Sequence, residues 1–244
     1  MKVKLIRDEF NLLPVLWKLG HSSEYLEDIE KLIEDKAEEL DKRRAKMIQE
    51  IKQEPGGEDE DLYLPRGWSR EEVNIHLLDI SLEDDFNKIE KAFPNLLRRS
   101  LFIYVYSVLE NTLNNCCRLL NFQSRPLADV KGKDAGIKRA RRYLEDANVR
   151  FPDEKWENII SYQKLRNCIT HNQGRLKGCN HEEDVRKFAL SNPYLSLMHT
   201  YEGDQEFIEV VFHKGFCEEV IQTISNFLEQ LQLNMEHRHR NEDF

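Results

Sequence analysis

Glycine and proline are scarce in this chain, which has 10 glycines and 7 prolines among its 244 residues. These two residue types supply most tight turns, so few turns are available. A β-sandwich or a barrel needs many turns, and the sequence therefore favours a mainly α fold. A hydrophobic fraction of 40% allows a real core, and a charged fraction of 33% is typical of long amphipathic helices.

Cysteines are few and form no recognisable pairing pattern. The five cysteines are odd in number and contain no C-x-x-C pair. Cys116 and Cys117 are adjacent in the chain, which does not suit an ordinary disulfide. We therefore expect a protein of the reducing cytoplasm.

Motifs of several enzyme classes are missing as well. The chain has no glycine-rich phosphate loop, no G-x-S-x-G element and no paired carboxylates in a metal-binding pattern. One zinc-like order exists, Cys168-x-x-His171 followed by Cys179-x-His181. Its second pair lacks the two-to-four-residue spacer of zinc sites, and Cys168 suits a small core position better. We expect neither a metal nor a cofactor.

Positive charge is in deficit, with 36 Lys and Arg against 45 Asp and Glu and a net charge of −9. This balance excludes a protein that coats nucleic acid through its overall charge, but it permits a local basic site. Charges interrupt the first eight residues, so we expect no signal peptide. Glu110 and Arg118 interrupt the apolar stretch 101–120, so we expect a buried helix there and no membrane span.

The first part of the chain, residues 1–94, is predicted to be an N-terminal helical extension. Helical spacing of apolar residues predicts one long helix over about 23–54. Ser69 and Glu72 match a capping box, which starts a new helix. Pro94 is expected to stop or kink the helical stretch that precedes it.

The remainder is predicted to be one helical domain, residues 95–235, followed by a frayed polar tail, residues 236–244. Within this domain we expect helices at 95–121, 137–146 and 156–171, a β-hairpin with strands at 194–201 and 207–212, and a last amphipathic helix. Gly174 is expected to end the helix at 156–171. The expected fold class is mainly α: a helical bundle with an antiparallel helix pair at its centre and a small β-hairpin near the C-terminus.

The helix at 156–171 carries the most informative residues, Arg166, Asn167 and His171. Arginine holds phosphate with a planar fork, and histidine exchanges a proton near neutral pH. Asn167 and His171 share a helix face, whereas Arg166 and His171 point about 140° apart. One helix alone therefore does not direct both side chains into the same pocket. Two copies across a two-fold axis would each supply these three side chains to one shared cleft.

The pattern of an arginine, a polar residue and a histidine five positions after the arginine resembles the signature of the HEPN superfamily. The flanking segments 156–160 and 165–174, and the earlier segment 141–144, also resemble HEPN proteins of bacterial toxin and defence systems. The resemblance covers about residues 95–235. It implies a HEPN-like helical bundle that acts as a homodimer and as a metal-independent endoribonuclease on tRNA or mRNA.

The resemblance also implies roles for the three residues. RNA carries its own nucleophile, the 2′-OH beside the scissile phosphate. His171 would serve as general base, general acid or both, Arg166 would stabilise the charge on the phosphorane, and Asn167 would orient His171 or a phosphate oxygen. The products would be a 2′,3′-cyclic phosphate and a 5′-OH. The implied setting is toxin–antitoxin or antiviral defence, with an antitoxin or activating partner.

Two weaker signals support such a site. Glu110 lies within the most apolar helix, where a carboxylate needs a partner, and we predict Arg166 as that partner. The alternative is that Glu110 is solvated at the helix edge. A basic segment is predicted to guide RNA, and its residues are Lys131, Lys133, Lys138, Arg139, Arg141 and Arg142. The alternative is a solvated helix face.

Two other functions fit the same residues. One is a catalytically inactive HEPN module that dimerises and binds a nucleotide or a partner protein. The other is a structural helical dimer in which Arg166 and His171 only pack and cap a helix end. Toxicity on expression that His171→Ala relieves would separate the enzyme from both.

Overall fold

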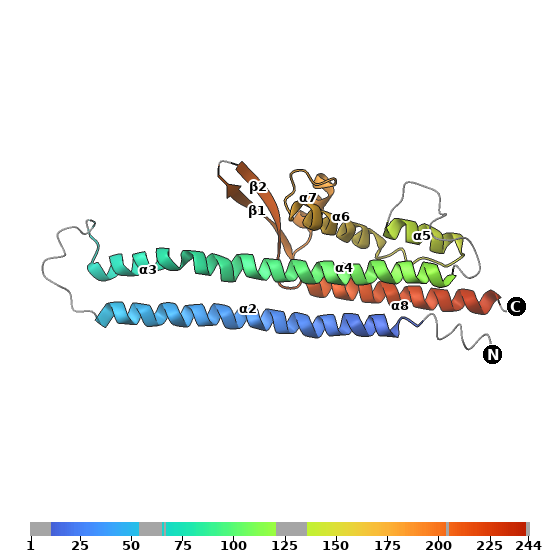
Figure 1. The fold of residues 1–244 in the computed structure, drawn as a ribbon, viewed down its shortest axis with the longest axis horizontal. Coiled ribbons are helices and arrows are strands. Elements are labelled where there is room, and N and C mark those ends of the chain that lie inside the picture. Colours follow the sequence, from blue (N-terminus) through green and yellow to red (C-terminus); the bar gives the residue numbers. More distant parts are fainter. Residues whose placement is uncertain (1–10, 54–64, 66, 121–135, 204, 243–244) are drawn as a thin grey trace. The chain divides into compact units, whose positions relative to one another are not determined.

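The computed structural model describes residues 11–53, 65, 67–120, 136–203 and 205–242. Their elements are α2 (Leu13–Gln53), α3 (Arg70–Asn87), a π-helical turn η2 (Lys88–Ala92), α4 (Phe93–Leu120), α5 (Ile137–Asp146), α6 (Trp156–Asn172), α7 (Glu182–Ser191), β1 (Leu195–Glu202), β2 (Gln205–Phe212) and α8 (Phe216–Glu242). The fold is mainly α with one antiparallel hairpin near the C-terminus, as predicted (Figure 1).

The chain divides into two compact units, one of residues 27–97 and the other of residues 1–26 together with 98–244. The helices α2 and α4 each contribute a segment to both units. None of the helices in the described ranges is both long enough and apolar enough to cross a membrane.

The unit of residues 27–97 has its own small core. Leu40 on α2 is buried with Leu78 and Leu82 on α3. Arg44 adds a two-point ion pair to Asp79, with N–O distances of 2.7 and 3.0 Å. The unit therefore holds α2 against α3 by apolar packing and by one oriented charge pair.

One prediction for this part of the chain needs correction, and a second becomes more specific. The long helix begins at Leu13 and not near residue 23, because Asn11 Oδ1 accepts the Leu13 N–H and starts the helix before Gly20. Of the two outcomes expected at Pro94, a stop or a kink, the stop does not occur. The Phe93 N–H bonds to Lys88 O in the π-helical turn, and this wider turn lets the chain pass into α4. The capping box at Ser69 and Glu72 is confirmed.

The other unit contains the expected antiparallel helix pair, which is α4 and α6. Arg99 near the start of α4 bonds to Gln173 O just after α6, and Glu110 further along α4 meets Arg166 earlier on α6. Buried aromatic rings on several elements fill the core beside this pair, with centroids 4.7–6.2 Å apart, and they are Phe102, Tyr162, Phe212 and Phe216.

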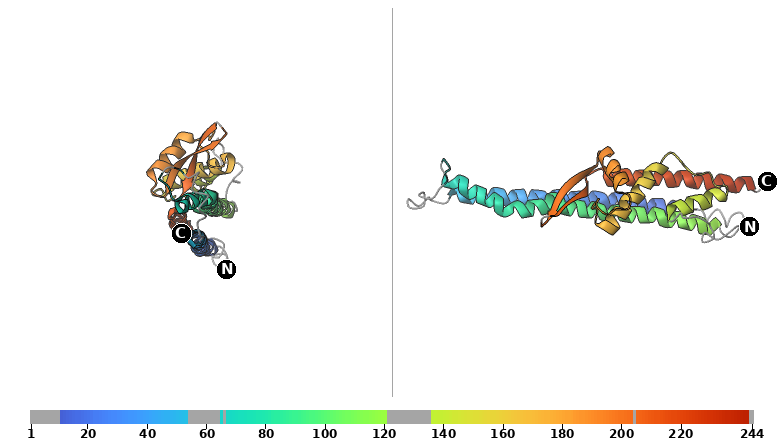
Figure 2. Two further views of the ribbon diagram at one scale, coloured as in Figure 1. Left: turned by 90° about the vertical axis from the view of Figure 1, so that its left-hand side faces the viewer. Right: turned by 90° about the horizontal axis from the view of Figure 1, so that it is seen from above.

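The hairpin and the shorter helices lie on the same side of α4. Figures 1 and 2 show α5, α6, α7 and the hairpin there, with β1 paired to β2 from Leu195 opposite Phe212 to Glu202 opposite Gln205. The first residue of the hairpin, Leu195, and its last residue, Phe212, each lie within one residue of the predicted limits, 194 and 212. The arrangement leaves the end of α6 between α4 and β2.

Two elements differ from the sequence-based expectation. The short helix α7 was not predicted, because only Val185 and Ala189 of its residues are buried and its apolar periodicity is therefore weak. The last helix α8 continues to Glu242, through most of the segment 236–244 that was expected to be a frayed tail. Met235 near that segment is still buried, so packing carries the helix onward.

Candidate functional site

The C-terminal end of α6 is a sharply defined helix stop. Gln173 adopts a left-handed conformation with φ of 57°, and Gly174 follows with φ of 84°. The N–H groups of Gln173 and Gly174 both bond to Cys168 O. Gly174 thus lies at the predicted stop, one residue past the cap, and the stop places His171 in the last helical turn.

Arg166 is held between two helices. Its Nη2 lies 2.5 Å from Glu110 Oε2 on α4, and its Nη1 donates to Asn167 Oδ1 at 3.0 Å. The Arg166 and Glu110 side chains are 23% and 26% exposed, so the pair is largely shielded from water. The predicted Arg166–Glu110 pair is present, which favours this prediction over the alternative of a Glu110 that is solvated at the helix edge.

Tyr106 and Gly136 complete the surroundings of this pair. The Arg166 guanidinium lies 5.1 Å from the centre of the Tyr106 ring. Burial, with the charge of Glu110 as a smaller cause, raises the pKa of Tyr106, so its hydroxyl stays protonated. That buried hydroxyl has no hydrogen-bond partner among the described residues. A Cβ on Gly136 would lie 3.0 Å from Glu110 Oε1, which is a tight contact, so a larger residue here would require the carboxylate to shift.

His171 is presented differently from Arg166. Its side chain is exposed, and within the described ranges it has no hydrogen bond or ion pair. Helix geometry places it on the same face as Asn167, whereas Arg166 turns toward α4. One chain therefore brings Arg166, Asn167 and Glu110 together and displays His171 separately.

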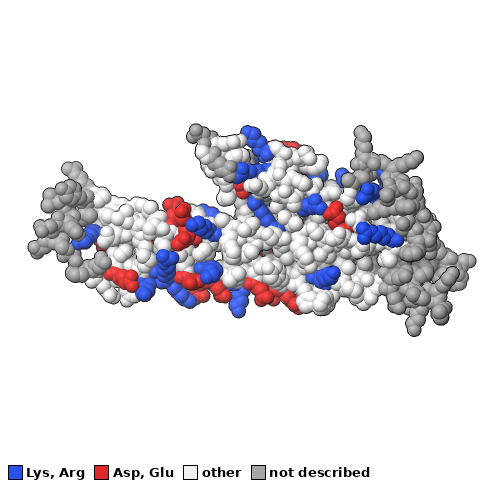
Figure 3. Space-filling model, viewed as in Figure 1, with Lys and Arg blue, Asp and Glu red and all other residues white. Residues whose placement is uncertain are grey.

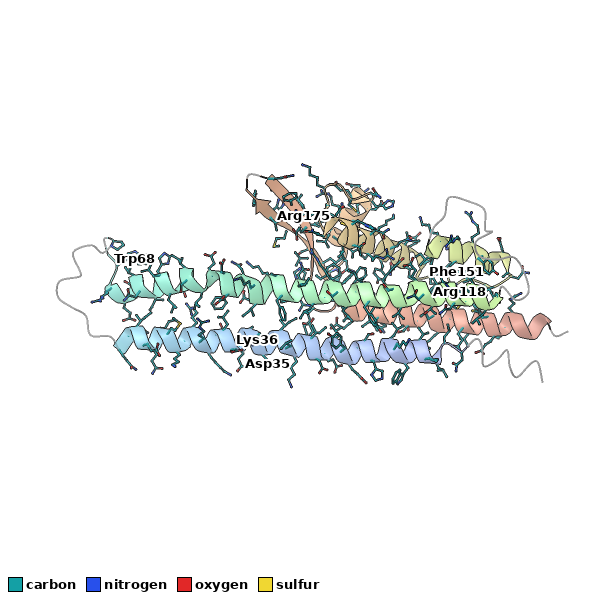
Figure 4. The ribbon with its side chains drawn as sticks, viewed as in Figure 1. Asp35, Lys36, Trp68, Arg118, Phe151 and Arg175 are labelled. Carbon is teal, nitrogen blue, oxygen red and sulfur yellow. The ribbon has the colours of Figure 1, made fainter. Side chains whose placement is uncertain are left out.

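A second charged cluster, which sequence reasoning missed, anchors the segment just after α6. Arg99 donates to Gln173 O at 3.0 Å and to Val210 O on β2. Arg99 and Arg175 both face Glu209, at 3.6 and 3.4 Å (Figure 4 labels Arg175). Burial lowers the pKa of Arg99, and Glu209 opposes this effect.

This second cluster ties the end of α6 to α4 and to the hairpin. Arg175 also lies over the Phe207 ring, with its guanidinium carbon 4.2 Å from the centroid. The only available sequence signal was an arginine, Arg99, at the start of a strongly apolar helix, and it needed a partner for the same reason as Glu110 did. That partner comes from β2, far along the chain, which no local pattern predicts.

The predicted basic segment splits in the structure. Lys131 and Lys133 lie outside the described residues, and the others are on α5, where Lys138 and Arg142 are exposed. Arg139 lies near Cys117 of α4. Burial raises the pKa of the Cys117 thiol, and the positive charge of Arg139 opposes this effect. Figure 3 shows basic side chains interspersed with acidic ones on the visible face, not gathered in one large patch.

Arg141 is already neutralised. It pairs with Glu145 and with Asp153, both at 2.8 Å. Its guanidinium also lies over the rings of Phe151 and Trp156, at 5.0 and 5.2 Å from their centroids (Figure 4 labels Phe151). Arg141 thus fastens α5 to the segment before α6, and Lys138 and Arg142 are the exposed members of the segment on α5.

The zinc-like order in the sequence does not form a ligand set. Within the described ranges, no group of three or more His, Cys, Asp or Glu side chains is placed to hold a metal ion. Cys168 is instead buried and donates to Arg175 O at 3.4 Å. Burial raises the pKa of the Cys168 thiol to about 12.

Comparison with family models gives no match to this chain, and comparisons with curated proteins and with solved structures give no significant match either.

Proposed function

We propose that this chain is a HEPN-type endoribonuclease that acts as a homodimer and without a metal ion. The observation that supports it best is the arrangement at the end of α6. Arg166 is held in place by Glu110 and Asn167, while His171 is exposed one turn after Asn167. A fixed cation and an accessible histidine are the two kinds of group that metal-free chemistry at a phosphate needs.

The dimer follows from the geometry of one helix. Arg166 and His171 of a single chain diverge by about 140°, so one phosphate does not easily reach both. A second copy that packs against this end of α6 across a two-fold axis would place its own histidine near the first copy's arginine. The shared cleft would then hold the scissile phosphate between protomers.

The proposed reaction is attack of the RNA 2′-OH on the adjacent phosphorus. His171 takes the 2′-OH proton as the O2′–P bond forms, and Arg166 stabilises the charge that gathers on the phosphoryl oxygens. The P–O5′ bond breaks, and the leaving 5′ oxygen takes a proton from the partner's imidazolium or from His171 itself. The ends are a 2′,3′-cyclic phosphate and a 5′-OH. DNA would be inert because it lacks the 2′-OH.

The biological setting belongs to the same proposal. A cytoplasmic nuclease that cleaves tRNA or mRNA would harm its own cell, so it needs restraint by an antitoxin or release by an activating partner. A toxin–antitoxin or antiviral defence role meets that need. This setting is supported by the HEPN resemblance of residues 95–235 alone.

The test is incubation of the purified protein with total tRNA and mRNA in EDTA, followed by analysis of the new RNA ends. Wild type should produce cyclic-phosphate ends, and Arg166→Ala and His171→Ala should not. His181→Ala is the matched control, because His181 is also exposed and lies in the same unit. Cleavage that persists in His171→Ala would reject the proposed role of this residue.

A second candidate is a catalytically inactive HEPN module that dimerises and binds a nucleotide or partner protein. It is favoured by the Arg166–Glu110 ion pair, which already neutralises much of the arginine charge. Saturable binding of a nucleotide without RNA turnover, measured by calorimetry, would support this candidate over the nuclease.

A further inference from the structure

A groove between α5 and α6 has a basic excess that a neighbouring groove lacks. It has a volume of about 570 Å³, and its charged lining comprises Lys138, Arg141, Arg142, Lys164, Glu145 and Glu157. The second groove, between the segment 150–155 and α8, has about 530 Å³ and carries two basic and two acidic residues, Arg150, Lys155, Asp153 and Glu154. Of two grooves of similar size, only the first has a lining that favours an anion.

The α5/α6 groove lies in register with the candidate active site. Ile160 and Lys164 line it, and they precede Asn167 and His171 at intervals of four, three and four residues. Residues at this spacing form one stripe along a helix. Lys164 is therefore about 10 Å from His171 along the axis of α6, on the same face.

The cations of the groove differ in how readily they can bind a ligand. Lys138 is exposed and has no ion-pair partner among the described residues, and Arg142 is exposed beside it. Lys164 Nζ lies 2.8 Å from Asp184, whose side chain is 50% exposed. The Lys164 side chain is only 24% exposed, but its carboxylate partner is open to solvent, so we expect a phosphate that enters the groove to be able to replace Asp184. Arg141 keeps its structural partners Glu145 and Asp153.

We propose that the α5/α6 groove is a subsite for the backbone of single-stranded RNA, in which Lys138, Arg142 and Lys164 hold the phosphate about three stacked nucleotides from the one cleaved at His171. This rests on the proposed nuclease function. A volume of about 570 Å³ is large enough for one nucleotide. The spacing follows from about 10 Å along α6 and about 3.4 Å per stacked nucleotide.

Binding of a single strand at several salt concentrations tests the subsite. The probe is a labelled 2′-deoxy oligonucleotide, which presents the same phosphates but has no nucleophile. Fluorescence anisotropy of the full chain gives the slope of log K against log salt. Each phosphate contact with a single strand contributes about 0.7 to this slope, so Lys138→Ala with Arg142→Ala should reduce it by about 1.4.

The matched control removes the same two residue types from the other groove. Arg150→Ala with Lys155→Ala removes one arginine and one lysine from the neighbouring groove and should leave the slope unchanged. Lys164→Gln, an independent variant on α6, should reduce the slope by about 0.7. Circular dichroism melting confirms that each variant is folded.

A slope unchanged in both the Lys138/Arg142 variant and Lys164→Gln would overturn the subsite. So would an equal loss in the Arg150/Lys155 control, because the effect would then be one of overall charge. Binding of an acidic peptide that needs Lys138 and Arg142, when the oligonucleotide does not, would assign the groove to a protein partner and reject RNA.

Cleavage by the same wild-type preparation reports on the nuclease separately. Cleavage by wild type with no change of slope in the variants would reject the RNA subsite and leave the nuclease proposal standing. The expected change of slope without cleavage of any RNA would reject the nuclease proposal and leave phosphate binding in the groove standing. If both hold, shortening the RNA to fewer than three nucleotides beyond the cleaved bond should lower kcat/KM of wild type. The same shortening should have a much smaller effect in the Lys138/Arg142 variant.

Discussion

The guanidinium of Arg166 lies 2.5 Å from a carboxylate oxygen of Glu110, across the antiparallel pair of α4 and α6. This contact joins the residue most suited to bind a phosphate to a carboxylate in the most apolar helix of the chain. Glu110 fixes where Arg166 points, and it also lowers the net charge that a phosphate would meet. The positioning of Arg166 by Glu110 therefore favours phosphate binding, whereas the negative charge of Glu110 opposes it. A conservative substitution of Glu110 separates these two effects.

Glu110→Gln should destabilise the protein by about 1 kcal/mol, because it weakens a charge-assisted hydrogen bond between two side chains that are roughly three-quarters shielded. Urea unfolding measures this change. Glu183→Gln is the control, since Glu183 pairs with Lys187 at 3.5 Å on the surface and its loss should not change the unfolding midpoint.

The same variant tests how Glu110 affects the reaction. If Glu110 serves to position Arg166, Glu110→Gln should lower kcat of RNA cleavage and leave KM nearly unchanged. An increase in phosphate affinity with no cleavage in either protein would instead favour the binding module over the nuclease.

Buried thiols predict a loss of stability in alkaline solution. Burial raises the pKa values of Cys116, Cys117 and Cys168 to about 12 from an ordinary value of 9.0. Because the unfolded chain releases these protons first, stability is full below pH 9 and is lost as the pH rises from 9 toward 12. Each thiol contributes about 1.4 kcal/mol per pH unit in that window.

Urea unfolding at pH 8, 9.5 and 10.5 measures this slope. Cys116→Ala should reduce the slope by about 1.4 kcal/mol per pH unit, because one buried thiol no longer titrates. Burial also raises the pKa values of Tyr106 and Tyr162, so some alkaline loss should remain in this variant. An unaltered slope in Cys116→Ala would contradict the assignment to this thiol.

Gly174→Ala should be more costly than an alanine at another left-handed glycine. An added Cβ at Gly174 would lie 2.7 Å from Arg99 Nη2, whereas at Gly203, with φ of 60°, it would meet nothing within 4 Å. Both substitutions carry a backbone penalty of about 1–2 kcal/mol. Gly174→Ala should also displace Arg99 from the carbonyls that it binds, and thermal unfolding should show the larger loss for this variant.

Sequence periodicity was sufficient for the elements whose signals are local. The capping box at Ser69 and the helix of α5 follow from spacing within a few residues, and both are present as predicted. The helix stop after His171 also follows from one glycine, Gly174. These features depend on neighbours in the chain, so composition and pattern predict them.

The features that the sequence did not predict depend on distant parts of the chain. Arg99 is fixed by carbonyls of Gln173 and Val210 and by Glu209, which lie far beyond it in sequence. The neutralisation of Arg141 by Asp153 likewise arises from tertiary packing. The Arg166–Glu110 pair was predictable only because both residues were expected on neighbouring core helices, where an unpaired charge is costly.

The separation of Arg166 and His171 within one chain leads to a complementation experiment. Arg166 turns to Glu110 on α4, and His171 is exposed on another face of α6, so an active cleft should combine the arginine of one protomer with the histidine of its partner. Arg166→Ala and His171→Ala should each be inactive alone. A heterodimer of the two variants, purified through two different tags, retains one intact arginine and one intact histidine on opposite chains. It should recover cleavage in EDTA, with cyclic-phosphate ends.

An inactive heterodimer, shown to be dimeric by light scattering, would mean that each cleft draws both groups from the same chain. A chain that stays monomeric at the concentrations at which it cleaves RNA would reject the shared cleft altogether.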